Sequence, residues 1–408
     1  MADLLCAIDV GTTKVSAIIA EVVGDNTLEI LGYGRAASDG MARGVVVNVA
    51  AATAAIGQAV EEAERAADRS ISRAYVGIAG SHIQSQPSKG AVPTGRNRIV
   101  TAEDVARAKE AARAVPLPHN REIIHVVPRS FAVDEQEDLQ EPIGMHGFRL
   151  SVDAQVISGA TGAVRNLVRC VQTHGIEIEE LVLEPLASGE AVLTDAERDM
   201  GVAVVDMGGG TSDLAMFMRG SLWHTMVIDL GGQHLTHDLA VGLGAPLEAA
   251  EQLKVRHGSA LASRVPTEQE VTVEVFGESV PRSVSRQLVA EILEARAEEM
   301  IDLVLREIKR SGYEGLVPAG LVLTGGTAQL AGLRELAKER TQLPVRIGVP
   351  AGIANLPAEL ATPENATGVG LLLWALHNPW TSNKLSERRQ RSPFIERIMG
   401  WLRNLLPG

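Results

Sequence analysis

One short pattern occurs twice in this chain, with about half of the sequence between its two copies. In the first copy the apolar run LLCAI at residues 4–8 is followed by DVGTTK at residues 9–14. In the second copy GVAVV at residues 201–205 is followed by DMGGGTSD at residues 206–213. In both places a buried strand leads into an acidic residue and a Gly/Thr turn. This repeat predicts an α/β chain built from two similar halves.

The turns of both copies have the composition of phosphate-binding loops. Glycines let the backbone approach a ligand closely, so that successive N–H groups point at phosphate oxygens, and Thr hydroxyls donate further hydrogen bonds. A Lys adds a positive charge on the phosphates. The predicted phosphate-binding residues are Gly11, Thr12, Thr13, Lys14, Gly208, Gly209, Gly210 and Thr211.

The carboxylate at the end of each strand predicts a divalent cation. Asp9 and Asp206 would repel phosphate unless a cation lay between them, and Mg²⁺ is commonly held by one or two carboxylates, phosphates and water. The alternative is that these stretches are two ordinary Gly-rich hairpin turns. The matched strand–Asp–Gly–Thr order of the pair favours a site for Mg²⁺ and phosphate.

A third motif lies at residues 319–330, where the apolar run AGLVLT ends in Gly325 and Gly326 and a helix is expected to begin near Leu330. These glycines would let a flat ring lie against the backbone. With all three motifs in this order, the chain resembles the actin-like ATPase superfamily. Residues 184–189 and 363–371 resemble the two connecting helices of that superfamily. The resemblance implies two duplicated ribonuclease-H-like domains with ATP bound between them.

The amino-acid composition excludes some classes of function. The formal net charge of −13 argues against nucleic-acid binding, which requires a basic face. The two cysteines, Cys6 and Cys170, have no spacing typical of a metal site or a disulfide framework, so we expect a reduced, cytosolic compartment. No uncharged apolar run is long enough to cross a bilayer, and any membrane attachment is therefore expected to be peripheral.

The amino-acid composition of the first half changes between about residues 81 and 159. Residues 15–20, 28–33 and 43–47 are predicted to form a short antiparallel meander, and residues 49–69 a helix. The following segment is rich in proline and contains one predicted helix at residues 102–113, after the capping residue Thr101. A small domain inserted at this point resembles that of the FtsA family, the actin homologues of bacterial cell division.

That resemblance predicts a domain division. The first ATPase subdomain comprises residues 1–82, 162–192 and 360–380, the inserted interaction subdomain residues 83–161, the second ATPase subdomain residues 193–238 and 318–359, the helical subdomain residues 239–317, the basic linker residues 381–392 and the membrane-targeting helix residues 393–408.

The last sixteen residues form an amphipathic pattern after Pro393. Apolar residues recur at helical spacing on one face, namely Phe394, Ile395, Ile398, Trp401, Leu402, Leu405 and Leu406. Residues 381–408 contain six Lys or Arg against two Glu, a net charge of +4, whereas the remainder carries −17. A basic linker before an apolar stripe is typical of a membrane-surface anchor. The alternative is a terminal helix that packs on the protein's own core.

Three further residues receive roles from the superfamily resemblance. Glu251 and Lys254, three positions apart on a predicted helix at residues 247–257, are assigned to the ribose and adenine. The alternative for this pair is an exposed helical ion pair. Glu184 resembles the residue that positions the attacking water, and Asp206 and Asp213 offer further carboxylates for a Mg²⁺-bound water.

The family resemblance implies an ATP-binding filament protein with weak or no ATPase activity, at the inner face of the cytoplasmic membrane. Its expected partners are the C-terminal peptide of FtsZ on residues 239–317, further copies of itself, anionic lipid and other membrane proteins of the divisome, with no nucleic acid. A sugar or acetate kinase would share the phosphate loops, and a pilus-assembly actin homologue would share a related insert. The apolar tail favours the FtsA family over both.

Overall fold

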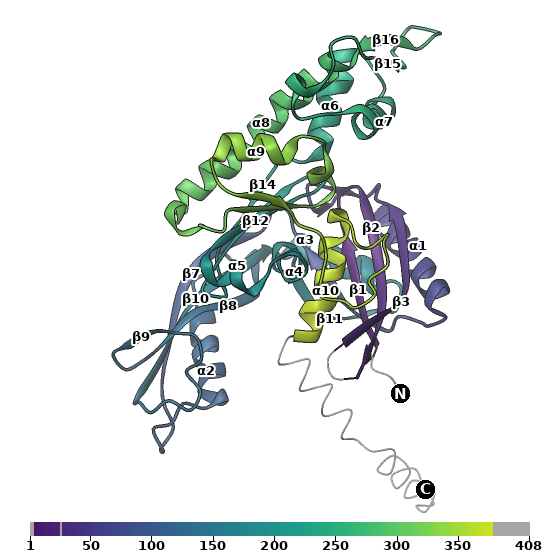
Figure 1. The fold of residues 1–408 in the computed structure, drawn as a ribbon. Helices are drawn as coiled ribbons and strands as arrows, with labels where there is room; N and C mark the ends of the chain where they lie inside the picture. The colour runs from purple at the N-terminus through teal and green to yellow at the C-terminus, as the bar shows by residue number, and fades with distance from the viewer. Residues whose placement is uncertain (1–3, 25–26, 378–408) are drawn as a thin grey trace, which may run out of the picture.

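The computed structural model describes residues 4–24 and 27–377, and two five-stranded sheets of the same topology form its centre (Figure 1). The first sheet has the order β11 (Glu177–Leu183), β6 (Arg73–Ile78), β1 (Leu4–Val10), β2 (Lys14–Val23) and β3 (Thr27–Ala37). The second sheet has the order β18 (Val345–Ile347), β17 (Leu321–Thr324), β12 (Val202–Met207), β13 (Ser212–Met218) and β14 (Ser221–Ile228). Each sheet combines an antiparallel meander of three strands with two strands parallel to the first one. The predicted repeat is therefore confirmed at the level of topology.

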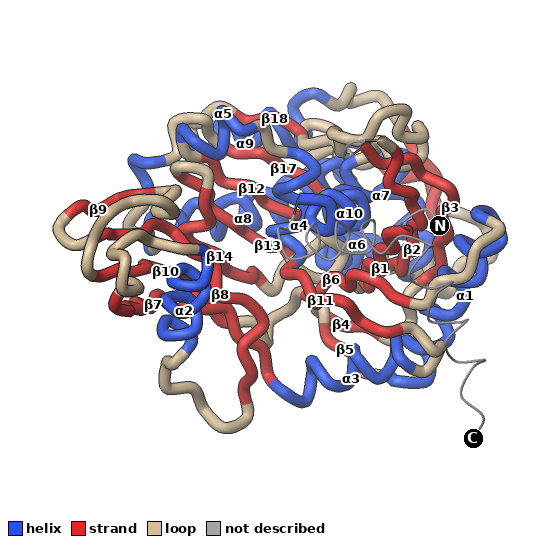
Figure 2. Tube along the Cα trace, turned by 90° about the horizontal axis from the view of Figure 1, so that it is seen from below, coloured by secondary structure: helices blue, strands red, loops and turns tan. Residues whose placement is uncertain are grey.

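Helices cover both faces of the first sheet. α1 (Val49–Ala67) packs on β2 and β3 and lies beside α3 (Thr161–Gln172), whereas α10 (Ala366–His377) packs on β1, β2 and β6. Figure 2 shows the strands as a layer between α1 and α3 on one side and α4 (Glu184–Val192) and α10 on the other. The 3₁₀ helix η4 (Pro363–Asn365) leads directly into α10.

The pair α4 and α10 forms a helical layer between the two sheets. A Cβ atom added at Gly370 of α10 would lie 1.8 Å from the carbonyl oxygen of Ala187 in α4, so the two backbones touch and only glycine fits there. β12 is buried on both of its faces, and Val202 and Val204 belong to the core around these helices. Ala203 and Val205 alternate with them and belong to the core of the second half.

The second half carries its remaining helices in a separate group. α8 (Arg286–Arg310) and α9 (Leu333–Thr341) pack against each other and over the second sheet. The other elements of this half are α5 (Asp195–Met200), α6 (Gly232–Leu243), α7 (Leu247–His257), η1 (Ala262–Arg264), β15 (Glu270–Val273), β16 (Arg282–Ser285), η2 (Glu314–Leu316) and η3 (Gly326–Gln329). Figure 1 shows α6, α7 and the β15–β16 ribbon at one end of the molecule.

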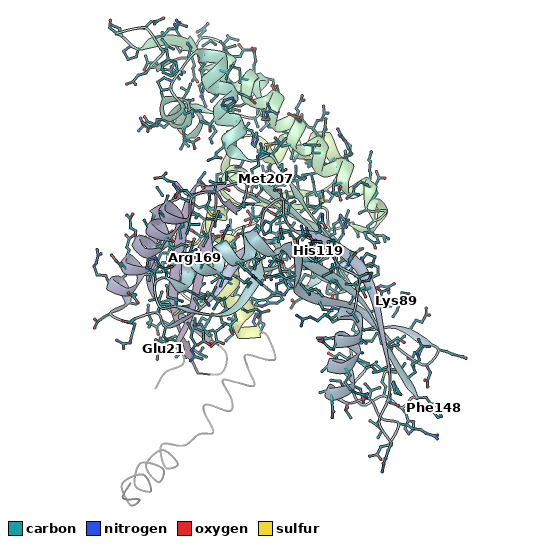
Figure 3. The ribbon with its side chains drawn as sticks, turned by 180° about the vertical axis from the view of Figure 1, so that it is seen from behind. Glu21, Lys89, His119, Phe148, Arg169 and Met207 are labelled. Atoms are coloured by element: carbon teal, nitrogen blue, oxygen red, sulfur yellow. The ribbon has the colours of Figure 1, made fainter. Side chains whose placement is uncertain are left out.

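The insert forms its own four-stranded antiparallel sheet. Its order is β7 (Gln84–Pro93), β10 (Arg149–Ala160), β8 (Arg121–Val133) and β9 (Gln136–Leu139). α2 (Ala102–Arg113) covers β7 and β10 over a small core that includes Val100, Phe131 and Val152. Phe148 is 61% exposed and lies at the far tip of the insert in Figure 3. The helix predicted at residues 102–113 is confirmed with its capping box at Thr101.

Two local predictions are wrong. Residues 43–47 do not add a third strand to the meander, because β4 (Met41–Ala42) and β5 (Val45–Val46) pair only with each other. β3 pairs with β2 and is the outer strand of the sheet. The helix expected near Leu330 begins at Leu333, because Gly332 adopts a φ of +81° and separates η3 from α9.

Among the described residues no helix combines the length and apolar character needed to cross a bilayer. The predicted linker at residues 381–392 and the amphipathic helix at residues 393–408 lie outside the described residues.

His125 at the base of the insert leads to a prediction about pH. Its side chain is 7% exposed, its Nε2 accepts a hydrogen bond from the Leu183 N–H at 3.1 Å, and burial lowers its pKa from 6.5 to about 4. Between pH 6.5 and about 4 the unfolded chain binds a proton at His125, whereas the folded protein keeps His125 neutral. The stabilisation is therefore complete above pH 6.5 and is lost as the pH falls towards 4, by about 3 kcal/mol.

We expect His125→Gln to show a smaller loss of unfolding free energy than the parent protein between pH 7 and 4, measured by urea denaturation. His82, whose pKa is also lowered, stays in both proteins, so the difference between them isolates His125. Parallel stability curves for the two proteins would contradict a neutral buried His125.

Candidate functional site

The two predicted phosphate loops face each other across the gap between the two sheets. The Gly11 N–H donates to the Lys14 carbonyl at 2.9 Å, and the Gly208 N–H donates to the Thr211 carbonyl at the same distance, so both turns close in the same way. A Cβ atom added at Gly209 would lie 2.3 Å from Cγ2 of Thr13. The absence of a side chain at Gly209 is therefore what lets the loops touch.

A cavity of about 100 Å³ lies between the loops, and a larger cavity of about 680 Å³ adjoins it. The smaller one is lined by both loops and by Glu184, Asp213 and Thr367. The larger one is lined by α6, α7 and η3 and includes Glu251 and Lys254. Thr13, Arg35, Gly209, Gly326 and Glu364 line both cavities. The two form one cleft with a narrow end and a wider end.

Acidic groups dominate the narrow end of the cleft. Asp9, Asp206 and Asp213 are buried, and Glu184 stands beside them at the first turn of α4. Burial and the neighbouring Asp206 raise the pKa of Asp213 to about 7. Burial, followed by the charges of the neighbouring carboxylates, raises the pKa of Glu184 well above its usual value. Burial also raises the pKa values of Asp9 and Asp206. Such a group of carboxylates is adapted to an added positive charge.

The carboxylates keep free acceptor capacity. Oδ2 of Asp213 accepts from the Thr211 hydroxyl at 3.0 Å, whereas its buried Oδ1 has no hydrogen-bond partner in the described part of the chain. The Thr367 hydroxyl donates to Oδ2 of Asp206 at 3.0 Å. Oxygen ligands of this kind suit Mg²⁺. The described residues contain no group of three or more side chains placed to hold a metal by themselves, so phosphate and water oxygens would complete the coordination of Mg²⁺.

Lys14 enters the cleft from β2 and is held by the second connecting helix. Its Nζ donates to Oδ1 of Asn365 at 2.8 Å and lies 3.7 Å from Oε2 of Glu364. Arg35 of β3 also pairs with Glu364, at 3.3 Å. The side chain of Lys14 is only 11% exposed, and burial lowers its pKa. Its amino group therefore stays at the loop ends.

The predicted adenosine-binding pair lies in the wider part of the cleft. Nζ of Lys254 donates to the Gly232 carbonyl at 3.1 Å and to Oε2 of Glu251 at 2.7 Å. The Thr236 hydroxyl also donates to Oε2 of Glu251. Glu251 and Lys254 therefore form an ion pair and also line the cavity, and their assignment to ribose and adenine stays a prediction.

The third motif lies where the two parts of the cleft meet. Gly325 adopts a φ of +84°, and a Cβ atom added there would lie 2.4 Å from Oδ1 of Asp206. The Thr327 hydroxyl donates to the Gly208 carbonyl at 2.9 Å. The N–H of Gly232 donates to the same carbonyl oxygen, also at 2.9 Å. The second phosphate loop, η3 and α6 thus form one hydrogen-bonded unit.

All the site residues predicted within the described chain line this cleft, but sequence reasoning missed others. Four residues at the site were not assigned to it, although residues 363–371 were predicted to form the second connecting helix: Arg35, Glu364, Asn365 and Thr367. The polar run Glu364-Asn365 directly before an apolar helix was a sequence signal for these two residues only. The predicted membrane residues lie outside the described residues.

This cleft between two sheets of equal topology defines the class of protein, an actin-like fold. A structure described as a PilM–PilN type IV pilus biogenesis complex aligns with a TM-score of 0.65 and 17% identity over 92% of this chain and 99% of that chain. MreB5 of Spiroplasma citri bound to ADP aligns with a TM-score of 0.53 and 15% identity over 94% and 98%. These structural similarities show a shared fold only.

Sequence comparison identifies the family. The model of "Cell division protein FtsA" matches residues 203–370, and that of the "SHS2 domain inserted in FTSA" matches residues 80–158. The cell division protein FtsA of Pseudomonas aeruginosa is 39% identical over 406 residues, which are 98% of this chain and 97% of that protein. The chain belongs to the FtsA family of cell division proteins.

The loop contact leads to a second prediction. We expect Gly209→Val to weaken ADP binding by about tenfold or more, because its side chain must displace Thr13 and because overpacking costs about 1–3 kcal/mol. Titration calorimetry measures this change. Gly95→Val is the matched control, since a Cβ atom there meets no other atom. Unchanged affinity in the Gly209→Val protein would remove Gly209 from the phosphate site.

Proposed function

We propose that the cleft binds ATP with Mg²⁺. The observation that carries this proposal is the pair of like-folded Gly/Thr loops that meet face to face, each preceded by a buried aspartate. The N–H groups of both loops and the amino group of Lys14 suit phosphate oxygens. The carboxylates suit a hydrated cation between protein and phosphate. The nucleotide seen in MreB5 of Spiroplasma citri, which has the same fold, supports the proposal.

The wider cavity suits the nucleoside. Gly326, which lines both cavities, presents a backbone surface without a side chain, against which a planar base can lie. Oε2 of Glu251 already accepts two hydrogen bonds, and the carboxylate can also accept from a ribose hydroxyl. We assign the base and ribose to the space between η3 and α7. Titration calorimetry with ADP and ATP, each with and without Mg²⁺, tests the proposal directly, and the absence of binding under all four conditions would refute it.

Glu184 is proposed to position the attacking water. It reaches the narrow end of the cleft from the first turn of α4, where a carboxylate can accept a hydrogen bond from a water molecule beside the phosphates.

Glu184→Gln is therefore expected to leave ATP affinity within about threefold and to lower single-turnover hydrolysis by about 100-fold, because it removes the base and keeps the shape. Glu190→Gln is the matched control, because Glu190 lies on the same helix but pairs with Arg198 at 2.7 Å and does not line the phosphate cavity. A parallel loss of affinity and rate in Glu184→Gln would assign this residue to binding instead.

We further propose the cellular role that membership of the FtsA family implies. In this role the protein assembles into filaments on the inner membrane surface and links FtsZ to it, with the FtsZ C-terminal peptide on residues 239–317 and other division proteins as further partners. We also propose the division of residues 1–380 into the four subdomains predicted from the sequence. The sequence of residues 381–408, with its net charge of +4 and its apolar stripe, supports peripheral attachment to anionic lipid.

Membrane attachment leads to a prediction for the tail. A chain ending at Ser392 and the variant Trp401→Glu should both fail to float with anionic vesicles, because one lacks the apolar stripe and the other places a charge at its centre. High salt should release the parent protein only partly, since salt screens the basic residues but not apolar burial. Nucleotide affinity serves as the control and should stay unchanged. Flotation of the truncated chain at the parent's level would refute the anchor.

A further inference from the structure

Arg35 is a cation of the cleft that belongs to neither phosphate loop. It lies on β3, the outer strand of the first sheet, opposite Ser16 of β2, which follows the first loop. Side chains two positions apart on a strand share a face. On that face of β3, Oη of Tyr33 lies 3.5 Å from Oδ1 of Asn365. Nη1 of Arg35 donates to Oε1 of Glu364 at 3.3 Å, so the outer strand places Arg35 beside η4 and the cleft.

The position of Arg35 along the cleft is the junction of its two cavities. Arg35 lines both the cavity of about 100 Å³ and the cavity of about 680 Å³. The residues that share this property come from both phosphate loops, the third motif and η4, namely Thr13, Gly209, Gly326 and Glu364. With the phosphates in the narrow end and the nucleoside in the wider end, the phosphate bonded to the ribose lies at this junction.

The charges at the junction differ from those of the narrow end. Glu364 lies 3.3 Å from Arg35 and 3.7 Å from Lys14, so two positive charges and one negative charge leave these three groups with a net charge of +1. The three buried aspartates of the site line only the smaller cavity. The junction therefore favours an anionic group, whereas the narrow end favours a cation.

The guanidinium of Arg35 keeps hydrogen-bond donors for a ligand. Its bond to Glu364 is the one side-chain hydrogen bond that it makes within residues 4–24 and 27–377, although a guanidinium has several N–H groups. The side chain is 51% exposed, so the other donors are open to solvent in the cleft. A guanidinium fork matches two oxygens of a phosphate. Glu364 can therefore hold one arm of Arg35 while the other N–H groups bind a ligand, without any rearrangement.

We propose that Arg35 binds the phosphate next to the ribose, with one arm held by Glu364 and its other N–H groups donating to the phosphate oxygens. This contact comes from the outer strand of the first sheet and adds to those of the two loops and Lys14. It makes nucleotide affinity depend on a positive charge at position 35. The inference rests on the proposed function, because it requires a nucleotide with its phosphates in the narrow end of the cleft.

The test compares the affinities of ADP and ATP by titration calorimetry. Arg35→Gln should weaken the binding of both by about tenfold, as expected for the loss of charge-assisted hydrogen bonds. Arg35→Lys keeps the charge but not the fork, and should weaken binding by about threefold or less. ADP and ATP should be affected equally, because both carry the phosphate next to the ribose.

Arg282→Gln is the matched control. Arg282 is also 51% exposed and also pairs with a glutamate, Glu278, but it lines neither cavity of the cleft. Its replacement should leave both affinities unchanged. Urea denaturation without nucleotide should give Arg35→Gln and the parent protein similar free energies of unfolding, because exposed ion pairs contribute little to stability.

Salt separates a direct contact from the field of a nearby charge. Between 0.1 M and 1 M salt the screening length falls from about 10 Å to about 3 Å. At 1 M salt Arg35→Gln should still bind ADP about threefold or more weakly than the parent protein, because a direct hydrogen bond does not depend on a long-range field.

Four results would overturn the role of Arg35 while the nucleotide site stands. These are parent-like affinity in Arg35→Gln, an effect that disappears at 1 M salt, an equal loss in Arg35→Lys and Arg35→Gln, and a loss confined to ATP, which would place Arg35 at the terminal phosphate. A parent protein that binds neither ADP nor ATP would overturn the proposed function and this inference together.

Discussion

The direct contact between α4 and α10 is the interaction on which the rest of the structure depends. Gly370 lies against the Ala187 carbonyl, so the two helices approach as closely as their backbones allow, and the sheets pack on them from both sides. The same helices start at the cleft, where Glu184 begins α4 and Thr367 lies in the first turn of α10. One helix pair therefore sets the spacing of the two halves and supplies residues of the site.

The cleft brings several carboxylates close together, which is electrostatically unfavourable. Asp9, Asp206 and Asp213 are buried close to one another, and burial raises the pKa of each. Lys14 compensates for this only partly, because it is shared with Asn365 and Glu364. Such an arrangement costs folding free energy that a core of apolar residues would not. A bound cation would offset this repulsion, and its binding would then stabilise the folded protein.

Local sequence signals were reliable wherever the structure is decided by neighbours in the chain. The turns at Gly11 and Gly208 follow from glycine and a strand-ending aspartate, and the helix after Thr101 follows from its capping box. The missed site residues have distant partners, 161 positions away for Thr367 and Asp206 and 351 for Asn365 and Lys14. No periodicity connects such positions. The late start of α9 depends on the left-handed conformation of Gly332, which a Gly-containing run allows but does not require.

The sequence by itself determined the duplicated halves, the two Gly/Thr loops, the Gly-Gly turn of the third motif and the family, because each depends on short runs in which residue type limits the backbone. Only the tertiary structure decided how closely the loops meet, which residues hold Lys14, and that Arg129 of the insert contacts Trp223 of the second half. The physical reason is that these contacts arise from the packing of rigid sheets and helices on one another. Their geometry is a property of the assembled layers, which no single segment encodes.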